Sequence, residues 1–363
     1  MYIYQYSKWP EFEVDYDQVG ELLEQVTRKQ GILAGKMHWL GFQQKEVSTL
    51  HNMTIDLIKS SEIEGEMLAN DQVRSSIARR LGMDIAGLVP SDRNIDGLVE
   101  MLLDATQGNA PVTQERLFSW HSALFPTGKS GRFSIQVGTW RDDRNGPMQV
   151  VSGPIGRDRV HFEAPPAVKV AGEMERFLHW INASDRLAPV IKAAIAHLWF
   201  LTIHPFDDGN GRIARAISDL LLTKAEGVNQ RYYSMSAQIR KDREGYYKIL
   251  EFTQRDDLDI TDWVLWFLNC LSLALDESES ELEAVIEKAR FWEHNKQVSM
   301  NERQTAMVNR LLDGFVGKLT STKWATICKC SPDTALRDLQ DLITKEVLVK
   351  DQSGGRSTAY LLK

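Results

Sequence analysis

The chain has 363 residues, of which 43% are hydrophobic and 26% are charged, proportions typical of a soluble globular protein. Its formal net charge of −7 argues against a protein coated in nucleic acid. Three cysteines cannot build the disulfide framework of a secreted scaffold. At about 150 residues per domain, the length favours two or three domains.

Neither the N-terminus nor the most apolar segment has the features of a membrane protein. Residues 1–12 contain no basic stretch followed by an apolar one, so we expect no signal peptide. The most apolar segment, residues 193–203, is shorter than the roughly 20 residues that a membrane-spanning helix needs. These features predict a cytoplasmic protein that has no membrane segment.

Hydrophobic periodicity predicts helices through most of the first 297 residues. Apolar side chains at helical spacing, among them Val47, Leu50 and Leu57, mark one face of a helix over residues 43–59. The other predicted helices are 15–30, 92–104, 114–124, 167–182, 189–203, 210–226, 236–254, 259–273 and a charged connector over 277–296. The predicted fold class is therefore mainly α.

One segment, residues 131–166, interrupts the helical pattern because it is rich in Gly, Pro, Arg and β-branched residues. Two extended stretches, 137–141 and 148–151, flank the dipeptide Asn-Gly at residues 145–146, which favours a tight β-turn. A third extended stretch, 159–162, precedes two prolines. The sequence predicts a β-hairpin in this segment, with its turn at the Asn-Gly pair.

The last 66 residues have a different organisation. The predicted elements are helices over 301–313, 321–329 and 332–345, a strand over 347–350, a turn at 353–355 and a strand over 358–362. A helix, a helix–turn–helix and a hairpin occur in this order in a winged helix. Residues 298–363 hold ten Lys and Arg against seven Asp and Glu, a net +3, which leaves −10 for the first 297 residues.

The segment HPFDDGNGRIAR, residues 204–215, combines several chemical groups. An apolar helix ends before it, since its second residue is a proline, and an amphipathic helix begins inside it. The free N–H groups of that helix, the two glycines, Arg212 and Arg215 form a cradle for an anion. Asp208 is suited to bind Mg²⁺ beside a phosphate, and His204 is suited to accept a proton from a hydroxyl. Together they predict attack of a hydroxyl on a phosphate.

This segment resembles the signature of the Fic family, HPFx[DE]GNGRxxR, at every defined position. The resemblance implies transfer of AMP from ATP to a Ser, Thr or Tyr hydroxyl of a protein, with Mg²⁺ as the cofactor. It implies that His204 is the general base, that Asp208 holds Mg²⁺ and that Phe206 anchors the loop. The implied nucleotide-binding residues are Gly209, Asn210, Gly211, Arg212, Arg215, Tyr246 and Tyr247. Gly211 also separates this chain from a kinase-like branch that has Lys at this position.

A second motif follows the helix predicted over 43–59. Ser60, Glu64 and Gly65 fit the pattern [ST]xxxE[GN] of an inhibitory helix in the Fic family. Taken alone, the segment would be a helix end with exposed glutamates and a glycine C-cap. The resemblance implies instead that Glu64 pairs with Arg215 through a strong carboxylate–guanidinium contact and misplaces ATP. Some relatives use the same glutamate to remove AMP, so a reverse activity stays open.

The resemblance also divides the chain. The domain limits are 1–42 for an N-terminal helical extension, 43–275 for the Fic catalytic core, 276–297 for a connector helix and 298–363 for the winged helix. Within the core, the inhibitory helix covers about 43–65. The hairpin, over about 131–166, resembles a flap that aligns a target segment by main-chain pairing. The alternative for the hairpin is that it only covers the core.

We make separate predictions for two tyrosines and one histidine outside the motifs. Tyr246 and Tyr247 resemble a family segment near the adenine, and adjacent residues of a helix point to different faces. We therefore expect at most one of them to stack on the base. His197, in the apolar helix before the motif, is expected to be a core residue with hydrogen-bond partners.

The implied partner is a protein with a hydroxyl side chain, and that protein can be the chain itself. The winged helix is expected to contact a protein or a second copy of this chain rather than DNA. Its second helix has only Arg337 and Lys345 as bases, beside Asp333, Asp338 and Asp341, whereas DNA affinity depends on neutralising phosphates. The alternative function is a DNA-binding regulator whose core senses nucleotide.

Overall fold

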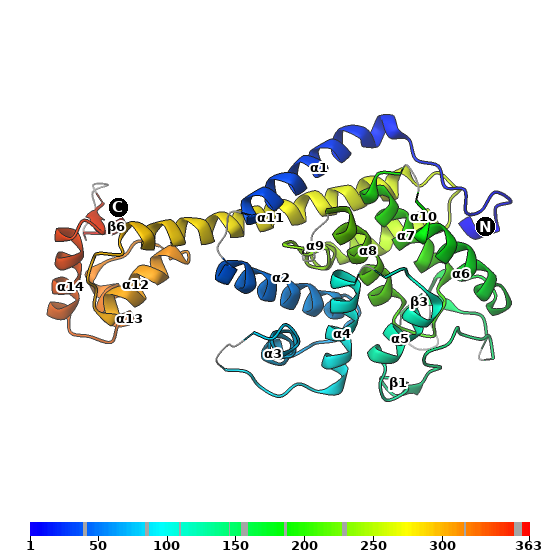
Figure 1. Ribbon diagram of the computed structural model, residues 1–363, viewed down its shortest axis with the longest axis horizontal. Coiled ribbons are helices and arrows are strands. Elements are labelled where there is room, and N and C mark those ends of the chain that lie inside the picture. The colour runs from blue at the N-terminus through cyan, green and yellow to red at the C-terminus, as the bar shows by residue number, and fades with distance from the viewer. Residues whose placement is uncertain are drawn as a thin grey trace. The chain divides into compact units, whose positions relative to one another are not determined.

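The computed structural model describes residues 1–38, 42–83, 87–108, 110–144, 146–153, 159–184, 187–226, 231–315, 317–351 and 358–363. The chain divides into two compact units, Met1–Ser278 and Glu279–Lys363. Helices make up most of both units, which confirms the mainly α prediction (Figure 1). Among the described residues, no helix has the length and apolar character that a membrane span requires.

The first unit is built around two buried helices. Its helices are η1 (Ile3–Gln5), α1 (Tyr16–His38), α2 (Phe42–Ile63), α3 (Asn70–Arg80), α4 (Arg93–Gln107), α5 (Gln114–Leu124), α6 (Ala167–Asn182), α7 (Pro189–Ile203), α8 (Asn210–Glu226), α9 (Met235–Lys241), α10 (Arg243–Gln254) and the first part of α11 (Thr261–His294). Helices α7 and α8 pack against each other. Every side chain of α7 from Val190 to Ile203 is buried, because this helix is apolar on all sides.

Several predicted helix limits differ from the structure. Helix α1 continues to His38 and not to residue 30, and α2 continues to Ile63 and not to residue 59. The helix predicted over 236–254 is divided at Asp242, whose side chain accepts a hydrogen bond from the backbone N–H of Gly245 and so caps α10. The helices predicted over 259–273 and 277–296 form one continuous helix, α11. The residues between them contain neither Gly nor Pro, so nothing in the sequence interrupts the helix there.

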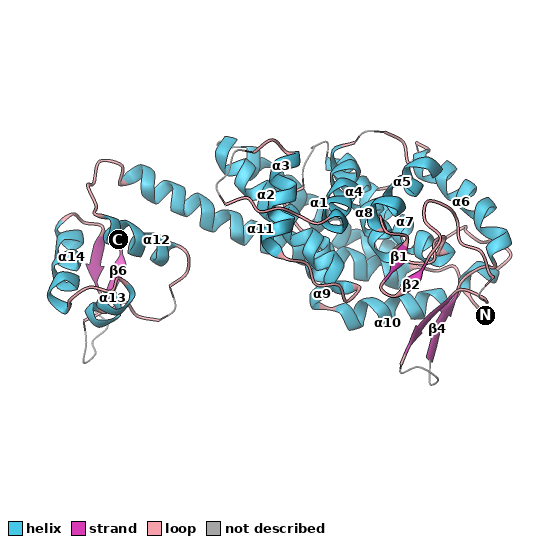
Figure 2. Ribbon diagram, turned by 90° about the horizontal axis from the view of Figure 1, so that it is seen from below, coloured by secondary structure: helices cyan, strands magenta, loops and turns pink. Residues whose placement is uncertain are grey.

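The β segment forms a hairpin, but not with the predicted pairing. Its strands are β1 (Lys129–Ser130), β2 (Phe133–Ser134), β3 (Gln149–Ser152) and β4 (Arg159–Glu163). Strand β3 pairs antiparallel with β4, and Figure 2 shows this hairpin projecting from the helices. The predicted pairing of 137–141 with 148–151 is wrong, and Asn145 of the predicted turn lies outside the described residues. Residues 137–141 instead run beside the motif loop, where the backbone N–H of Arg141 donates to the carbonyl of Pro205.

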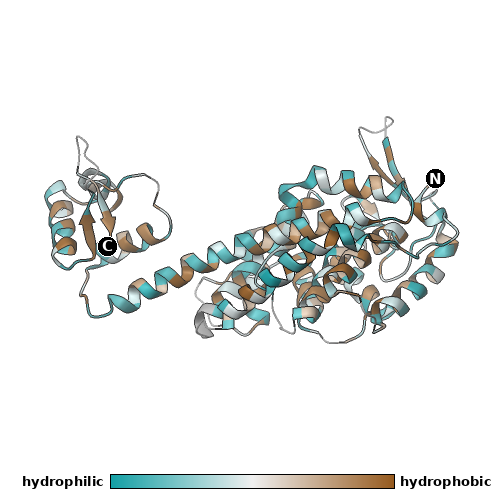
Figure 3. Ribbon diagram, turned by 90° about the horizontal axis from the view of Figure 1, so that it is seen from above, coloured by the Kyte–Doolittle hydropathy of each residue, from teal (hydrophilic) through white to brown (hydrophobic). Residues whose placement is uncertain are grey.

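The second unit contains the predicted helices and hairpin in the predicted order. Its elements after α11 are α12 (Glu302–Leu312), α13 (Ser321–Ile327), α14 (Pro332–Thr344), β5 (Leu348–Lys350) and β6 (Tyr360–Leu362). Its core surrounds the fully buried Trp324, and Figure 3 shows the two strands as mostly apolar. A β-bridge joins Leu319 to Tyr360. The predicted turn at 353–355 lies outside the described residues, and the assignment as a winged helix stays a prediction.

Candidate active site

The motif loop joins the two central helices of the first unit. Helix α7 ends at His204, which has a left-handed backbone conformation with φ of 51° and ψ of 60°. Helix α8 begins six residues later at Asn210, after Gly209 with φ of 81°. The side chain of Asn210 closes the loop, because its Oδ1 accepts from the N–H of Phe206 (3.0 Å) and its Nδ2 donates to the carbonyl of Phe206 (2.8 Å). The loop therefore has a fixed shape before any ligand binds.

The imidazole of His204 is arranged as a base. Its Nδ1 lies 3.2 Å from the carbonyl oxygen of Leu201, and a carbonyl can only accept, so Nδ1 carries the proton and Nε2 does not. Burial lowers the pKa of His204 to about 4, and the positive charge of Arg141 also lowers it. The neutral ring with a free Nε2 is therefore the form present at pH 7.

Asp208 is the carboxylate of the motif loop that could hold a cation. Its Oδ1 accepts from the N–H of Gly209 (2.5 Å) and its Oδ2 accepts from the hydroxyl of Ser130. In the described part of the chain, no three or more side chains of His, Cys, Asp or Glu form a group that could hold a metal ion. One carboxylate fits Mg²⁺ in a nucleotide site, where phosphate oxygens and water supply the remaining ligands.

Both motif arginines are held by carboxylates. Nη2 of Arg215 lies 2.7 Å from Oε1 of Glu64, and Ser60 accepts from the same guanidinium through its hydroxyl (2.8 Å) and its carbonyl (3.0 Å). Nη1 of Arg212 lies 2.8 Å from Oε2 of Glu66. The prediction that Glu64 meets Arg215 agrees with this geometry, whereas sequence reasoning missed Glu66.

Each of these arginines also has a buried donor without a partner. Nε of Arg212 and Nη1 of Arg215 make no hydrogen bond in the described structure. Such orphan donors are costly unless a ligand satisfies them. A Cβ placed on Gly211 would lie 3.3 Å from Nη1 of Arg215 and 2.1 Å from Oε1 of Glu64. The glutamate carboxylate thus lies where an anion would meet both the glycine and the orphan donor.

The C-terminal turn of α2 places Glu64 at this point. Gly65 has φ of 83°, a conformation that glycine adopts without strain at a helix C-terminus. The N–H of Gly65 donates to the carbonyl of Glu62, and the N–H of Glu66 donates to the carbonyl of Ser61. The predicted C-cap role of Gly65 agrees with this turn, which directs Glu64 and Glu66 to the two arginines.

The two tyrosines of α10 have different environments. Tyr246 is 1% exposed, and its hydroxyl pairs with Nε2 of His197 at 2.9 Å, while Nδ1 of that histidine pairs with Ser218. His197 is therefore the core residue that we expected. Tyr247 is 36% exposed, with the guanidinium of Arg243 5.2 Å from its ring centre. Of the two, Tyr247 has the exposed ring that a base could stack on.

The site surrounds a cavity of about 710 Å³, which is within the range of small-molecule pockets. Strands β3 and β4 form one wall, and the motif loop and α10 form the others. The predicted site residues that line it are Glu64, His204, Asp208, Asn210, Gly211, Tyr246 and Tyr247. The predicted residues that do not line it are Ser60, Gly65, Gly209, Arg212 and Arg215. Because Glu64 lines the cavity and contacts Arg215, it covers that guanidinium on the cavity side.

Sequence reasoning also missed two side chains that hold the loop from behind. His121 of α5 stacks on the ring of Phe206, with 4.1 Å between the ring centres. Its Nδ1 accepts from the N–H of Gly138 and its Nε2 lies 3.2 Å from the carbonyl of Asp208. Burial lowers the pKa of His121 to about 4, so the neutral ring donates through Nε2. Arg141 is the second of these side chains, and neither residue belongs to a recognisable local pattern.

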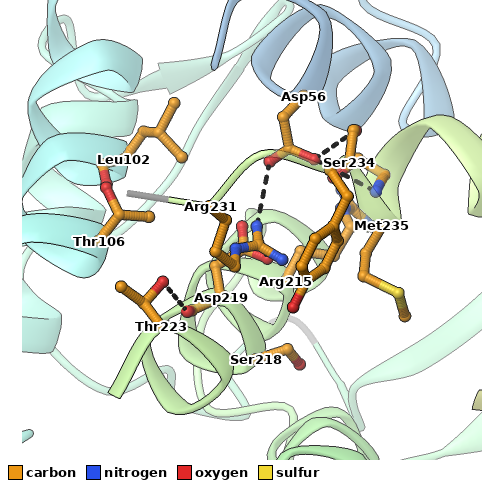
Figure 4. Close-up of polar contacts among 12 residues, drawn as sticks. Asp56, Leu102, Thr106, Arg215, Ser218, Asp219, Thr223, Arg231, Ser234 and Met235 are labelled. Atoms are coloured by element: carbon orange, nitrogen blue, oxygen red, sulfur yellow. Dashed lines mark hydrogen bonds and ion pairs between the residues drawn. The ribbon is translucent and has the colours of Figure 1, made fainter. Parts of the chain in front are cut away.

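A buried polar cluster joins α2, which Glu64 directly follows, to the motif helix α8. Arg231 lies 2.5 Å from Asp219 of α8 and 3.9 Å from Asp56 of α2 (Figure 4). Asp56 also accepts from the hydroxyl of Ser234 at 2.5 Å. Beside Arg231 lies a cavity of about 20 Å³, enough for about one water molecule. The cluster fixes the middle of α2 against α8.

Two family descriptions match parts of the chain. The Fic/DOC family matches residues 111–222, which include the motif loop, α7 and most of α8. A domain of unknown function, DUF4172, matches residues 2–83. This second match includes α1, α2 and the turn with Glu64.

The curated relatives share one stretch with this chain. Over 132 residues, this chain is 36% identical to a protein of Drosophila virilis named protein adenylyltransferase Fic. The aligned stretch covers 35% of this chain and 26% of that protein. The protein of the same name in Drosophila melanogaster is 35% identical over 132 residues. The chain thus spans about a quarter of the length of the curated relatives that it matches.

Solved structures extend the likeness in fold. A Fic family protein from Desulfovibrio desulfuricans aligns over 94% of this chain and 96% of its own, with a TM-score of 0.53 and 22% identity. The Fic-1 protein of C. elegans aligns over 74% of this chain and 75% of its own, with a TM-score of 0.51 and 18% identity. At such identities the likeness establishes the fold alone.

Proposed function

Because the chain belongs to the Fic family through its domain at residues 111–222, we propose that it is an autoinhibited protein adenylyltransferase. It moves AMP from ATP to a Ser, Thr or Tyr hydroxyl of a protein. The observation that carries this proposal is the pair of orphan donors on Arg212 and Arg215, together with the free imidazole nitrogen of His204, which lines the cavity. These donors suit a polyphosphate, and the imidazole suits a hydroxyl that attacks it.

In the transfer step, Nε2 of His204 takes the proton of the target hydroxyl. The hydroxyl oxygen forms a bond to the α-phosphorus of ATP, the bond from that phosphorus to the bridging oxygen breaks, and pyrophosphate leaves. The free N–H groups at the start of α8 and the two motif arginines hold the phosphate oxygens. Asp208 would hold Mg²⁺, which neutralises charge on the phosphates when bound.

The proposal includes autoinhibition by Glu64. Its carboxylate occupies the space above Gly211 and pairs with Arg215, so a γ-phosphate cannot use the same donors. A carboxylate in this place also repels the phosphate oxygens. ATP would then bind weakly or in a position that does not suit attack at the α-phosphorus.

Glu66 adds a second inhibitory contact to this proposal. It pairs with Arg212 at 2.8 Å, so each motif arginine has its own carboxylate from the same turn. The Glu66 side chain is 38% exposed, compared with 30% for Glu64. Solvent weakens an exposed ion pair, so we assign the larger share of inhibition to Glu64.

Transfer of a label from α-labelled ATP with Mg²⁺ tests the proposed function. We expect the Glu64→Gly protein to label itself or an added target, and the Glu64→Gly/His204→Ala double variant to lose this labelling. Glu62→Gly is the matched control, because Glu62 lies on the same helix but pairs with Lys59 and Arg240. No label with Glu64→Gly, at any target supplied, would count against the transferase.

Removal of AMP by the same core is the alternative enzymatic activity. It predicts that labelled target protein loses its label when wild-type chain is added, and keeps it with Glu64→Gly. Incubation of pre-labelled target with each protein, without ATP, separates the two directions.

The second unit is proposed to contact a protein or a second copy of this chain. Its helix α14 offers little positive charge, since Lys345, which caps the C-terminus of the helix, is occupied by Asp341 at 2.6 Å and by the carbonyl of Ser299 at 2.7 Å. The DNA-binding alternative predicts salt-sensitive retardation of duplex DNA. Its absence, together with labelling by Glu64→Gly, favours the transferase over a regulator.

A further inference from the structure

Behind the base of the proposed reaction lies a buried arginine that the motif does not include. The side chain of Arg141 has no exposed surface, although it belongs to the segment between β2 and β3. Burial of a guanidinium is costly unless its donors are satisfied. Each of its three nitrogens has an acceptor, so the residue is built into the structure at a defined place.

One nitrogen of this guanidinium holds the backbone of the base. Nε of Arg141 donates to the carbonyl oxygen of His204 at 2.7 Å. The backbone N–H of Arg141 donates to the next carbonyl, that of Pro205, at 2.9 Å. Arg141 therefore binds both carbonyls at the point where α7 ends and the loop begins.

The backbone that Arg141 holds is strained at His204. His204 has φ of 51°, a left-handed conformation that is strained for a residue with a Cβ. Such a conformation persists only where the surrounding structure fixes it. The contact of Arg141 with the carbonyl of His204 supplies this constraint, and the side-chain contact from Nδ1 to Leu201 then sets the ring.

The other two nitrogens fix the arginine itself. Nη2 donates to the carbonyl of Pro165 at 2.6 Å, after the end of β4. Nη1 pairs with Oδ1 of Asp143 at 2.9 Å, and Oδ2 of that carboxylate accepts from the N–H of Ala167, the first residue of α6. The guanidinium thus connects the motif loop to the base of the flap hairpin and to α6.

We propose that Arg141 is a positioning residue of the adenylyltransferase, which holds the left-handed backbone of His204 so that Nε2 is directed at the target hydroxyl. The inference rests on the proposed function for its consequence in catalysis. It rests on the structure alone for the conformation of His204. A lysine cannot replace Arg141, because one ammonium cannot reach three acceptors in a plane.

The kinetic test uses Arg141→Lys and Arg141→Gln in the Glu64→Gly protein. We expect kcat to fall about 10- to 100-fold in both, since a misplacement of about 1 Å in a reacting group has an effect of this size. KM for ATP should change less than about threefold, because Arg141 contacts none of the implied phosphate-binding residues.

Arg116→Lys and Arg116→Gln are the matched controls. Arg116 also bonds backbone carbonyls, those of Ala110, Pro111 and Asp104, and the carboxylate of Asp104. None of these acceptors belongs to the motif loop. The Arg116 variants are expected to become as sensitive to urea as the Arg141 variants but to keep their kcat. In that case the fall in kcat of the Arg141 variants comes from a misplaced His204 and not from lower stability. An equal loss of kcat in both pairs would overturn the proposal.

A second measurement does not depend on activity. The ring nitrogens of His204 are followed by NMR in protein with labelled histidine, with His204→Ala to assign the signal. The charged groups facing this ring are Arg141, Asp208 and Glu64, and loss of the positive one raises the pKa of His204. We expect a higher pKa and mixed tautomers in Arg141→Gln, and mixed tautomers alone in Arg141→Lys. An unchanged tautomer in both overturns the inference, and it does so even if no adenylyl transfer is found.

Discussion

Two variants of Glu64 separate the charge of this carboxylate from its bulk. Its Oε1 lies 2.7 Å from Nη2 of Arg215 and 2.1 Å from the position that a Cβ would take at Gly211. Glu64→Gln keeps the size of the side chain and removes the charge, whereas Glu64→Gly removes both. The structure predicts that the affinity for ATP rises in two steps, first with Glu64→Gln and then further with Glu64→Gly.

The size of the first step follows from the burial of the pair. Arg215 is 3% exposed and Glu64 30%, so solvent screens this contact only in part. A hydrogen bond between charged groups contributes about 1.5–3 kcal/mol, and we take about 2 kcal/mol for this partly shielded pair. That energy corresponds to roughly 30-fold in affinity. The remaining overlap with the phosphate position should make the second step at least as large.

The assay is calorimetric titration with a non-hydrolysable ATP analogue and Mg²⁺, alongside the initial rate of label transfer. Glu62→Gln and Glu62→Gly serve as controls on the same helix. If Glu64→Gln binds the analogue like the wild type while Glu64→Gly binds it tightly, bulk alone blocks the site and the charge argument fails. If neither variant differs from the wild type, Glu64 does not inhibit.

Three further expectations concern neighbouring groups. Glu66→Ala should raise the transfer rate only about two- to threefold, since the ion pair with Arg212 is partly exposed and contributes about 0.5 kcal/mol, and 0.5 M salt should reduce this gain. Tyr247→Ala should raise KM for ATP about tenfold if its exposed ring stacks on the base, with kcat nearly unchanged. Burial raises the pKa of Asp219 to about 8, in the same direction as the carboxylate of Asp56 and against the opposing effect of Arg231. The folded chain then keeps a proton that the unfolded chain releases near pH ~4, so the free energy of unfolding falls as pH rises towards 8. Urea denaturation at pH 6 and pH 9 should show this fall in the wild type and a smaller one in Asp219→Asn.

The motif could be read from the sequence because its chemistry is contiguous. Pro205 stops α7, the glycines turn the chain and Asn210 starts α8, so twelve residues define both the loop and its groups. The approach of Glu64 to Arg215 joins residues 151 positions apart. Only the resemblance to a family predicted it, since no local pattern specifies a contact at that distance.

The hairpin shows where local signals failed. An Asn-Gly pair favours a tight turn, yet β3 pairs with β4 and not with residues 137–141. The competing contacts are non-local, because the loop after β2 bonds to the motif loop through Arg141 and through the N–H of Gln136, which donates to Asp207. Tertiary hydrogen bonds of buried groups outweigh the propensity of a turn. For the same reason Arg141 and His121 could not be identified before the structure.

The proposed inhibition by Glu64 also has a consequence for which part of the chain would have to move to open the site. The proposed general base, His204, needs no change of conformation, since its ring is neutral and its backbone is held in place. The hindered group is Arg215, and the hindrance comes from the last turn of α2. About two turns earlier, Asp56 is fixed to the motif helix through Arg231 and Ser234. A signal that unwinds α2 only from Ser60 onward would free both arginines and leave this buried cluster intact. The proposed inhibition could therefore be relieved by a local change at one helix end, without a rearrangement of the core.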